Sequence, residues 1–452
     1  MKRLTLTFLL LATACAPVGP NYQRPEIALT STFSDSSAGP IGEVAQRAWW
    51  RAYNDPVLDA LVERGLRQNL DIAASLERIR AAQASLRATG VSAAVSGNLS
   101  GTVIRSGSET TAAGSTRSGS LSADLVLDLF GGIRREREGA AADLAAAQAD
   151  EGTARLAYLS SIVGAYIDAR YYQAAMTLTR QTVTTRAETQ TVTQQKYDAG
   201  SATQLDLAQV SALLDSARSD LPGLEADFLA EVYSIATLLG EPAGPLVTQM
   251  QRGRAQPRPR ATDATGVPAD LLRNRPDVRS AEMSFASATA AVGVATADLL
   301  PSVTLSGSAT RGGNNGWSFG PTISLPVLSQ PRLGAARDKA QSEARQAEIT
   351  WRNTVLGAVE DVQAAHSRWT RDRSTVTLLG SSAENYARAL QLSRDSYEQG
   401  ALSLLDLLDT DRSLATARLS QASAIRSLAV DWATLQVATG AGAYVGSAAA
   451  RP

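Results

Sequence analysis

The chain contains the same short pattern twice, two hundred positions apart. Residues 197–206 hold Tyr-x-x-Gly followed by Leu-Asp, and residues 397–406 hold it again at the same internal spacing. The matched pairs are Tyr197 and Tyr397, Gly200 and Gly400, Leu205 and Leu405, and Asp206 and Asp406. An offset of 200 residues is the size of a structural unit rather than of a local motif, so it predicts a duplicated chain with two structural repeats.

Long proline-free stretches dominate both halves. Residues 134–198 contain no proline, and neither do residues 333–438. A continuous helix of some 65 residues would be roughly 100 Å long, far beyond the usual globular helix. The heptad spacing of a coiled-coil seam is held after Gly400 by Leu407, Leu414, Leu428 and Leu435. Because glycine tolerates the left-handed backbone of a tight reversal, Gly200 and Gly400 are the predicted tips of two long helical hairpins.

Four other segments alternate strictly between apolar and polar residues. They are predicted strands at about residues 91–104, 119–129, 302–310 and 317–325. Alternation alone leaves two settings open, an apolar face against lipid or an apolar face against the core of a soluble sheet. Four strands cannot close a barrel. If the strands face lipid, several chains must share one barrel, because an open edge would leave backbone groups unpaired.

Each repeat is predicted to run helix, two strands, long helix, glycine turn, long helix. The predicted divisions are a lipoprotein signal peptide at 1–14, a lipidated extended segment at 15–60, repeat 1 at 61–240, a connector at 241–270, repeat 2 at 271–440 and a tail at 441–452. Residues 105–119 are rich in Gly, Ser and Thr and are predicted to form an exposed loop. Pro222 is predicted to interrupt and kink the helix that contains it.

The N-terminus has the order of a lipoprotein signal. Lys2 and Arg3 precede an apolar run that ends in Ala-Thr-Ala-Cys, with the cysteine at Cys15. Small residues before a cysteine are typical of lipoprotein cleavage, and Ala16 replaces the Asp that retains lipoproteins at the inner membrane. An ordinary signal peptide with an incidental cysteine is the alternative. The expected covalent group is lipid, diacylglycerol and palmitate, on Cys15, with no other cofactor.

Composition argues against several classes of function. With 43 basic and 44 acidic residues the chain lacks the basic excess of a nucleic-acid binder. It has one cysteine and one histidine, so a Cys/His metal site or a Ser-His-Asp triad would depend on His366 alone. His366 is interpreted as a surface or interhelical residue. No phosphate-binding loop and no metal site is predicted, which leaves an envelope enzyme as a weak alternative.

Several stretches in order resemble one family. They are VGPNYQRP at 18–25, the tryptophan pair at 49–50, DPVLDALV at 55–62, NLDI at 69–72, RPDVRSAE at 275–282 and the two Tyr-x-x-Gly tips. The chain resembles the outer-membrane factors, the TolC-like and OprM-like channels of tripartite efflux pumps, in the lipoprotein branch called NodT-type. It departs from them at Ala12 in the lipobox and before Val91, which lacks the proline found at Pro301.

The resemblance implies a fold and a function. The fold is α+β: a homotrimer with a twelve-stranded β-barrel, four strands per chain, continued by a long α-helical coiled-coil barrel. The function is the exit duct of a tripartite efflux or secretion system in the outer membrane of a Gram-negative bacterium, extending into the periplasm. It would pass small molecules such as drugs and open by an iris-like movement of its hairpins. The implied partners are a periplasmic adaptor, which would contact the tips at Gly200 and Gly400, and an inner-membrane transporter of RND type.

The resemblance also implies an aperture at the tips. Its candidate residues are Tyr197, Asp206, Tyr397, Asp406 and Asp409. Asp406 and Asp409 are three apart on a predicted helix and therefore share a face, so three chains would stack them into acidic rings. The first copy has Gln209 at the second position. Asp168 is predicted to lie along the helical barrel.

Two readings without an aperture stay open. The tip residues could be a solvated helical face with core tyrosines. The chain could also be a non-channel periplasmic or surface coiled-coil protein, in which the strands form a soluble domain. Heat-resistant trimers with barrel behaviour after detergent extraction would separate that protein from a channel.

Cys15→Ser is expected to abolish incorporation of labelled palmitate, because the thiol is the only acyl acceptor that the signal offers. The mutant protein is expected to stay partly functional, since the strands also hold it in the membrane. Labelling in growing cells followed by immunoprecipitation measures the acylation. Label that persists in Cys15→Ser would contradict the prediction.

Overall fold

The computed structural model describes residues 17–33, 42–260, 266–312 and 315–444. Cys15, the predicted signal peptide and most of the predicted tail lie outside the described residues. The described chain forms two compact units. Unit 1 contains the residues up to Ala28, Ser75–Glu151 and Asp277–Leu356. Unit 2 contains Leu29–Ala74, Gly152–Pro276 and the residues from Gly357 onward.

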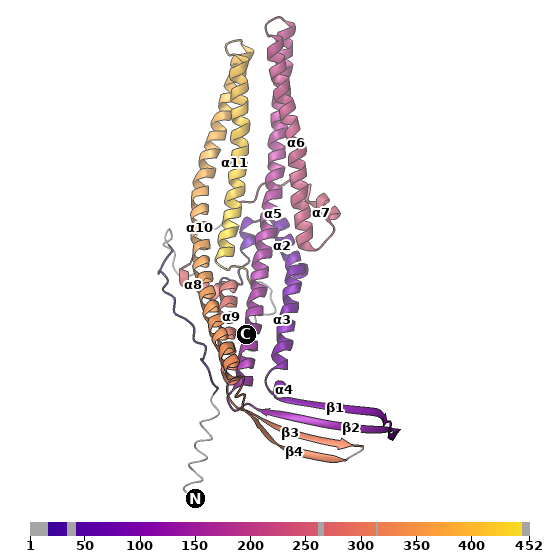
Figure 1. Cartoon of the computed structure of the whole chain (residues 1–452). Helices are drawn as coiled ribbons and strands as arrows, with labels where there is room; N and C mark the ends of the chain where they lie inside the picture. The colour runs from indigo at the N-terminus through magenta and orange to yellow at the C-terminus, as the bar shows by residue number, and fades with distance from the viewer. Residues whose placement is uncertain (1–16, 34–41, 261–265, 313–314, 445–452) are drawn as a thin grey trace. The chain divides into compact units, whose positions relative to one another are not determined.

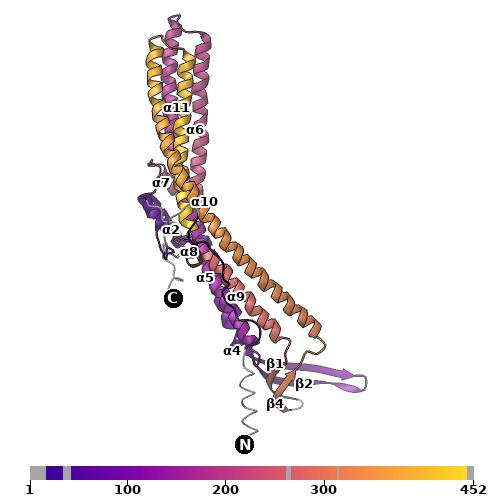
Figure 2. The ribbon, with the colours of Figure 1, turned by 90° about the vertical axis from the view of Figure 1, so that its left-hand side faces the viewer.

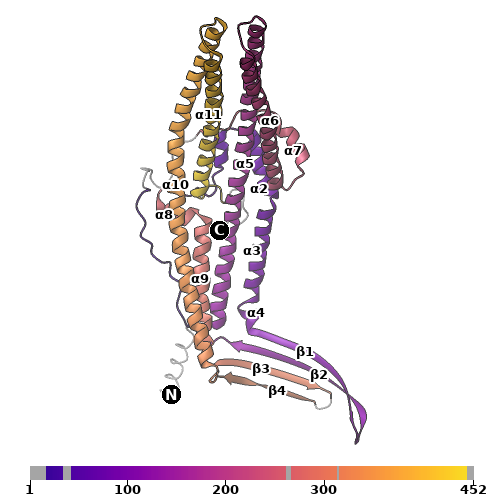
Figure 3. The ribbon, with the colours of Figure 1, turned by 45° about the horizontal axis from the view of Figure 1, so that its top comes forward.

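A single antiparallel sheet lies in unit 1 (Figure 3). Its strands are β1 (Val95–Ser108), β2 (Thr111–Leu127), β3 (Ser302–Arg311) and β4 (Gly316–Ser324), in that order across the sheet. The central pairing joins the two halves of the chain, with Leu121 on β2 opposite Ala309 on β3. Both repeats therefore contribute to one sheet, and β1 and β4 form its edges.

The sheet departs from the sequence prediction at two places. Residues Val91–Ala94 form a short helix, α4, so that β1 begins at Val95 rather than at Val91. The predicted loop 105–119 is wrong for most of its length, because β1 continues to Ser108 and β2 starts at Thr111. Ladder hydrogen bonds join backbone groups, so Gly, Ser and Thr continue a strand wherever a partner strand is present.

The two faces of the sheet differ in chemistry. One face exposes large apolar side chains, including Leu99 (78% exposed), Trp317 (83%) and Ile323 (72%). The opposite face carries hydroxyl pairs that bridge neighbouring strands, and Ser100 Oγ lies 2.7 Å from Ser120 Oγ. Side chains of a strand alternate between faces, so most large apolar residues share one face, with Ile104 and Val126 as exceptions on the opposite face.

The helices of unit 1 hold the start of the described chain. They include most of α3 (Leu70–Ala88) and α9 (Pro276–Ala297), and the first parts of α5 (Gly132–Asp198) and α10 (Gln330–Glu398). The buried Arg135 donates to the Val18 carbonyl at 3.1 Å and to Asn21 Oδ1 at 2.7 Å. Arg24 Nε donates to the buried Glu282 carboxylate at 2.8 Å. The VGPNYQRP segment is thus fastened to both α5 and α9.

Two long helical hairpins dominate unit 2. The first joins α5 to α6 (Gln204–Leu239), and the second joins α10 to α11 (Leu404–Ala438). Figures 1 and 2 show the four helices of the hairpins side by side. α5 has 67 residues and α10 has 69, as the proline-free stretches predicted. Each reversal contains a glycine with positive φ, +75° at Gly200 and +76° at Gly400.

Helices also form in the predicted extended segment, in the predicted connector and through Pro222. The segment predicted as extended, 15–60, contains a 3-10 helix, η1 (Trp49–Tyr53), and the start of α2 (Pro56–Gln68). The predicted connector contains α7 (Ala243–Met250) and the start of α8 (Pro268–Asn274). Pro222 lies inside the uninterrupted α6, so the predicted interruption of the helix is wrong, while the predicted kink stays a prediction. A proline removes one helical hydrogen bond, and packing along the rest of a 36-residue helix outweighs that loss.

Within the described ranges, no helix is both long enough and apolar enough to cross a membrane.

Aromatic side chains fill the core of unit 2 near α2 and α11. The Trp432 ring lies edge-on to Trp49 at 5.7 Å and to Tyr53 at 5.1 Å between centroids. The Tyr53 hydroxyl donates to the Ala429 carbonyl at 2.6 Å. On the other side of α2, a Cβ added at Gly65 would lie 1.8 Å from the buried Tyr158 hydroxyl oxygen. Contact between α2 and α5 therefore requires glycine at position 65.

Gly65→Ala is expected to destabilise the protein by about 1–3 kcal/mol, because the new methyl group overlaps the Tyr158 ring in a packed core. Gly164→Ala on α5 is the matched control, since a Cβ there meets no atom within 4 Å. The control is expected to be neutral or slightly stabilising. Thermal unfolding in detergent measures both. Equal melting temperatures for the two variants would contradict the requirement for glycine.

Candidate functional site

The first hairpin tip is built by a glycine turn and a helix cap. Gly200 N donates to the Tyr197 carbonyl at 2.9 Å, which closes the end of α5. Thr203 caps α6: the Asp206 N–H donates to Thr203 Oγ1 at 3.2 Å, and the Thr203 N–H donates to Asp206 Oδ2 at 2.8 Å. This reciprocal pair is a capping box with Asp in place of Glu.

The second tip repeats this construction. Gly400 N donates to the Tyr397 carbonyl at 3.1 Å. The Asp406 N–H donates to Ser403 Oγ at 3.3 Å, and the Ser403 hydroxyl donates to Asp406 Oδ2 at 2.6 Å. The repeated glycine and aspartate thus have a local cause, the reversal and the start of the return helix. Thr-x-x-Asp and Ser-x-x-Asp in the sequence are the signals that sequence reasoning missed.

The two tyrosines of the repeat lie in different surroundings. Tyr197 is 41% exposed, whereas Tyr397 is only 7% exposed. The Lys196 ammonium lies 4.1 Å from the centroid of the Tyr397 ring and donates to the Tyr397 carbonyl oxygen. The Tyr397 hydroxyl lies 3.3 Å from Thr193 Oγ1. Tyr397 therefore joins the second hairpin to the first.

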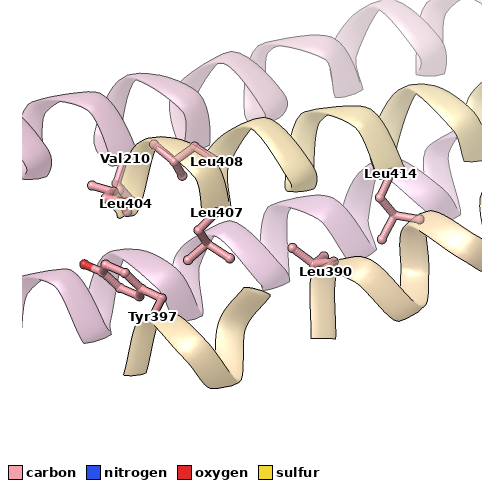
Figure 4. Packing of buried hydrophobic residues seen from close by; sticks show 7 residues of the cluster. All are labelled: Val210, Leu390, Tyr397, Leu404, Leu407, Leu408 and Leu414. Carbon is pink, nitrogen blue, oxygen red and sulfur yellow. The ribbon is translucent and has the colours of Figure 1, made fainter. Parts of the chain in front are cut away.

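A hydrophobic cluster surrounds Tyr397 (Figure 4). Its buried members are Val210, Leu390, Tyr397, Leu404, Leu407, Leu408 and Leu414. Val210 comes from α6 and the others from α10 and α11, so the cluster packs the two hairpins against each other. Leu407 and Leu414 belong to the heptad series found in the sequence.

A buried ion pair lies farther along the same helices. Arg186 Nε donates to Asp411 Oδ2 at 2.7 Å, and both side chains are 9% exposed. The same guanidinium donates to the Leu213 carbonyl at 2.9 Å, so it contacts α5, α6 and α11. Arg394 of α10 adds a second link, donating to Glu188 Oε2 at 3.1 Å. Sequence analysis had no signal for these pairs, because their partners are more than two hundred residues apart.

Two of the three acidic candidates, Asp406 and Asp409, are exposed. Asp406 and Asp409 line one groove between α6 and α11, together with Gln209 and Arg412. The two carboxylates share a helix face, as their spacing predicted. Asp206 is half-buried in its capping box and does not line that groove. None of these observations tests an aperture, which stays a prediction.

Three other titratable residues, Asp168, His366 and Asp431, have contacts with neighbouring side chains. Asp168, predicted along the helical barrel, accepts two hydrogen bonds from Arg426, one of them 2.9 Å from Nη2 to Oδ2. His366 is 7% exposed and lies beside Trp369 of the same helix, so it is not a surface residue. Burial, together with a hydrogen bond to Asp372 on α10, raises the pKa of Asp431 on α11 to about 6. Among the described residues, no group of three or more His, Cys, Asp or Glu could hold a metal ion.

Comparison with known proteins identifies the family to which this chain belongs. The profile of the outer membrane efflux protein family matches residues 61–241 and 267–441. Nodulation protein T of Rhizobium leguminosarum bv. trifolii is 40% identical over 450 residues, covering 96% of each chain. The pyoverdine export outer membrane protein OpmQ of Pseudomonas aeruginosa is 31% identical, covering 92% of each chain. The outer-membrane channel OprN superposes with a TM-score of 0.85 at 30% identity, over 94% of this chain and 99% of its own.

The chain therefore belongs to the outer membrane efflux protein family. Its location is the outer membrane of a Gram-negative bacterium, from which it extends into the periplasm. The likeness to OprN confirms the fold class predicted from the sequence, with four strands per chain and long helical hairpins in two repeats.

Asp411→Ala is expected to destabilise the protein by about 3–5 kcal/mol, because it leaves the buried Arg186 guanidinium without its counter-ion. Removing both charges with Arg186→Met and Asp411→Leu is expected to restore most of that loss. Thermal unfolding of Arg186→Met, of Asp411→Leu and of the double variant that combines them measures the coupling. If the double variant loses the sum of the two single losses, the pair is not coupled.

Proposed function

We propose that the protein is the outer-membrane exit duct of a tripartite efflux or secretion system, and that three copies assemble into one channel. Each copy contributes the four strands of unit 1 to a shared twelve-stranded barrel, and its hairpins to a helical barrel in the periplasm. The observation that carries the proposal is the sheet of unit 1, which has an exposed apolar face and two unpaired edges.

The sheet suits lipid better than water. Its apolar face exposes side chains that a soluble sheet would cover, such as Leu121 (55% exposed) and Phe319 (69%). The four strands have 14, 17, 10 and 9 residues, and about 9–11 tilted residues cross a bilayer. The edge strands β1 and β4 would leave unpaired backbone groups in hydrocarbon, and pairing between copies satisfies them. Membership of an efflux family supports the same assembly.

The hairpin tips are the proposed contact with a periplasmic adaptor. Both tips expose a leucine at the same repeat position, Leu205 at 66% and Leu405 at 67%. Each leucine lies in the first turn of its return helix, next to the reversals at Gly200 and Gly400. Each chain therefore presents two similar tip surfaces. An adaptor that presents several copies of one hairpin is suited to bind both. The adaptor in turn connects the channel to an inner-membrane transporter, for which we propose the RND type.

The proposed gate lies at the same tips. Asp406, Asp409 and Tyr197 are exposed, and we propose that they line the aperture. Tyr397 and Asp206 have other immediate roles, one packed between the hairpins and the other in the cap of α6, so they act by positioning the tips. Contacts such as that between Lys196 and Tyr397 keep the hairpins together. Iris-like opening requires that adaptor binding break these contacts and replace them with others.

The proposed cargo is small molecules. Some relatives carry names of this kind, such as the pyoverdine export protein OpmQ and a toluene efflux pump outer membrane protein of Pseudomonas putida. The protein is proposed to catalyse no reaction, and lipid on Cys15 is its one proposed covalent group.

Conductance measurements on purified protein in planar bilayers test whether it forms a channel. Heat-resistant trimers that give discrete conductance steps would support the channel. Stable trimers without conductance would instead indicate a structural coiled-coil protein.

The gate prediction concerns the acidic groove. Replacing Asp406 and Asp409 with Asn is expected to lower the cation-to-anion permeability ratio at least about threefold, because the rings focus a negative potential in a narrow opening. Asn is chosen because it keeps the shape of the Asp406 side chain at the start of α11. Reversal potentials in asymmetric salt measure the ratio.

The matched control removes two exposed carboxylates from α6, with Asp215→Asn and Asp220→Asn. Asp168 is unsuitable as a control, because its bond to Arg426 makes it structural. The control is expected to keep the wild-type ratio. If the Asp406/Asp409 variant inserts normally and also keeps the wild-type ratio, the acidic groove is not the gate.

A further inference from the structure

Three arginines lie on the apolar face of the sheet, near the loop end of its strands. Arg105 is opposite Ser115, Arg117 is opposite Val103, and Arg311 is opposite Gly119. These registers make Arg117 the diagonal neighbour of each of the other two, about 7–8 Å away along the sheet. All three side chains are exposed. They form one row across β1, β2 and β3, here named the arginine row.

The arginine row comes directly after the apolar positions of each strand. On β1 the apolar face runs from Val95 to Val103 and is followed by Arg105. This run measures roughly 27 Å along the strand, and less when tilted, which is close to the apolar band of about 25 Å in outer-membrane barrels. On β4 the same border carries Trp317, which is 83% exposed. An aromatic residue and cations together are typical of the boundary between hydrocarbon and headgroups.

The charge of this border is one-sided. The positions of β1 to β4 that share the apolar face carry no Asp or Glu, and the nearest strand carboxylate, Asp124, lies on the opposite face. Within the described residues, no ion pair engages any member of the arginine row. A guanidinium offers a planar fork of donors that matches a phosphate group. The row is therefore complementary to a surface of phosphate groups.

We propose that the arginine row binds the phosphate groups of an anionic glycolipid in the outer leaflet of the outer membrane. The proposal rests on the proposed function, because it takes the apolar face to be the one that meets lipid. The helices mark the periplasmic end of the sheet, so the opposite end, with the turn at Glu109 and Thr110, reaches the outer leaflet. Arginine is costly at the midplane of a bilayer but nearly neutral at this depth, where headgroup phosphates neutralise it.

The test compares one lipid with and without its phosphates. The probes are lipid A, a diphosphorylated glucosamine lipid, and the same lipid after enzymatic removal of both phosphates. Thermal-shift titration of the purified trimer in neutral detergent measures the affinity for each. The wild-type protein is expected to prefer the phosphorylated lipid. Each basic residue near an anionic surface strengthens binding roughly fivefold, so Arg105→Gln/Arg117→Gln/Arg311→Gln is expected to weaken it on the order of a hundredfold.

The matched control removes three exposed arginines of unit 1 from α3, with Arg78→Gln/Arg80→Gln/Arg87→Gln. This variant has the same change in net charge and is expected to bind lipid A like the wild type. Equal loss in both variants would mean a nonspecific charge effect and would overturn the proposal. So would wild-type affinity in the arginine-row variant, or equal affinity of the wild type for the two lipids.

A second measurement separates failure of this proposal from failure of the proposed function. Brominated lipids quench tryptophan that contacts the acyl chains, and the difference between wild type and Trp317→Phe isolates the signal of Trp317. If Trp317 is not quenched, the apolar face does not meet lipid, and both proposals fail. If Trp317 is quenched while the arginine-row variant binds lipid A normally, only the assignment of the arginine row fails.

Discussion

A helix of 67 or 69 residues requires lateral support, and the rest of the structure depends on how that support is provided. Isolated helices are marginally stable in water, and most of their stability in proteins comes from packing along one face. Here the chain reverses at a glycine after each long helix, and the return helix supports the part of the long helix that lies in unit 2. The reversal at Gly200 and Gly400 thus does more than end a helix. It brings the leucine seam of α11 against its neighbours, from which the buried cluster at the tips is built.

The duplicated tips keep the same local structure but have different tertiary contacts. The turn and the cap need only residues within ten positions, so both copies retain them. Contacts between the hairpins need a single partner, and here the copies differ. Lys196 corresponds to Ser396, Arg186 to Tyr386, and Asp411 to Ser211, so the links between the hairpins are present once per chain. Duplication supplied two equal hairpins, and divergence made them complementary to each other.

The sheet shows a similar dependence of one half on the other. Its central ladder pairs β2 with β3, so neither repeat could form the complete sheet by itself. Alternation then places the apolar residues and the arginine row on one face and the hydroxyl groups on the other. The edges remain unpaired in one chain, which is why assembly with further copies is part of the proposed function and not an addition to it.

The sequence by itself determined the features that depend on local periodicity. The heptads and the absence of proline predicted the long helices, the alternation predicted the strands, and the repeated glycines predicted the two reversals. Sequence reasoning also placed Asp406 and Asp409 on one face, because helical spacing is a local property. It extended poorly to the ends of β1 and β2, to α7 and to Pro222, where a neighbouring element decides whether a weak local preference prevails.

Only the tertiary structure decided which of the two repeated tyrosines is buried. Nothing near Tyr197 or Tyr397 in the sequence distinguishes an exposed ring from one packed beneath a lysine of the other hairpin. The partners of Asp411 and Glu282 were equally hidden, because each lies more than two hundred residues away. Burial and charge pairing are set by distance in space, and a linear pattern records distance only along the chain.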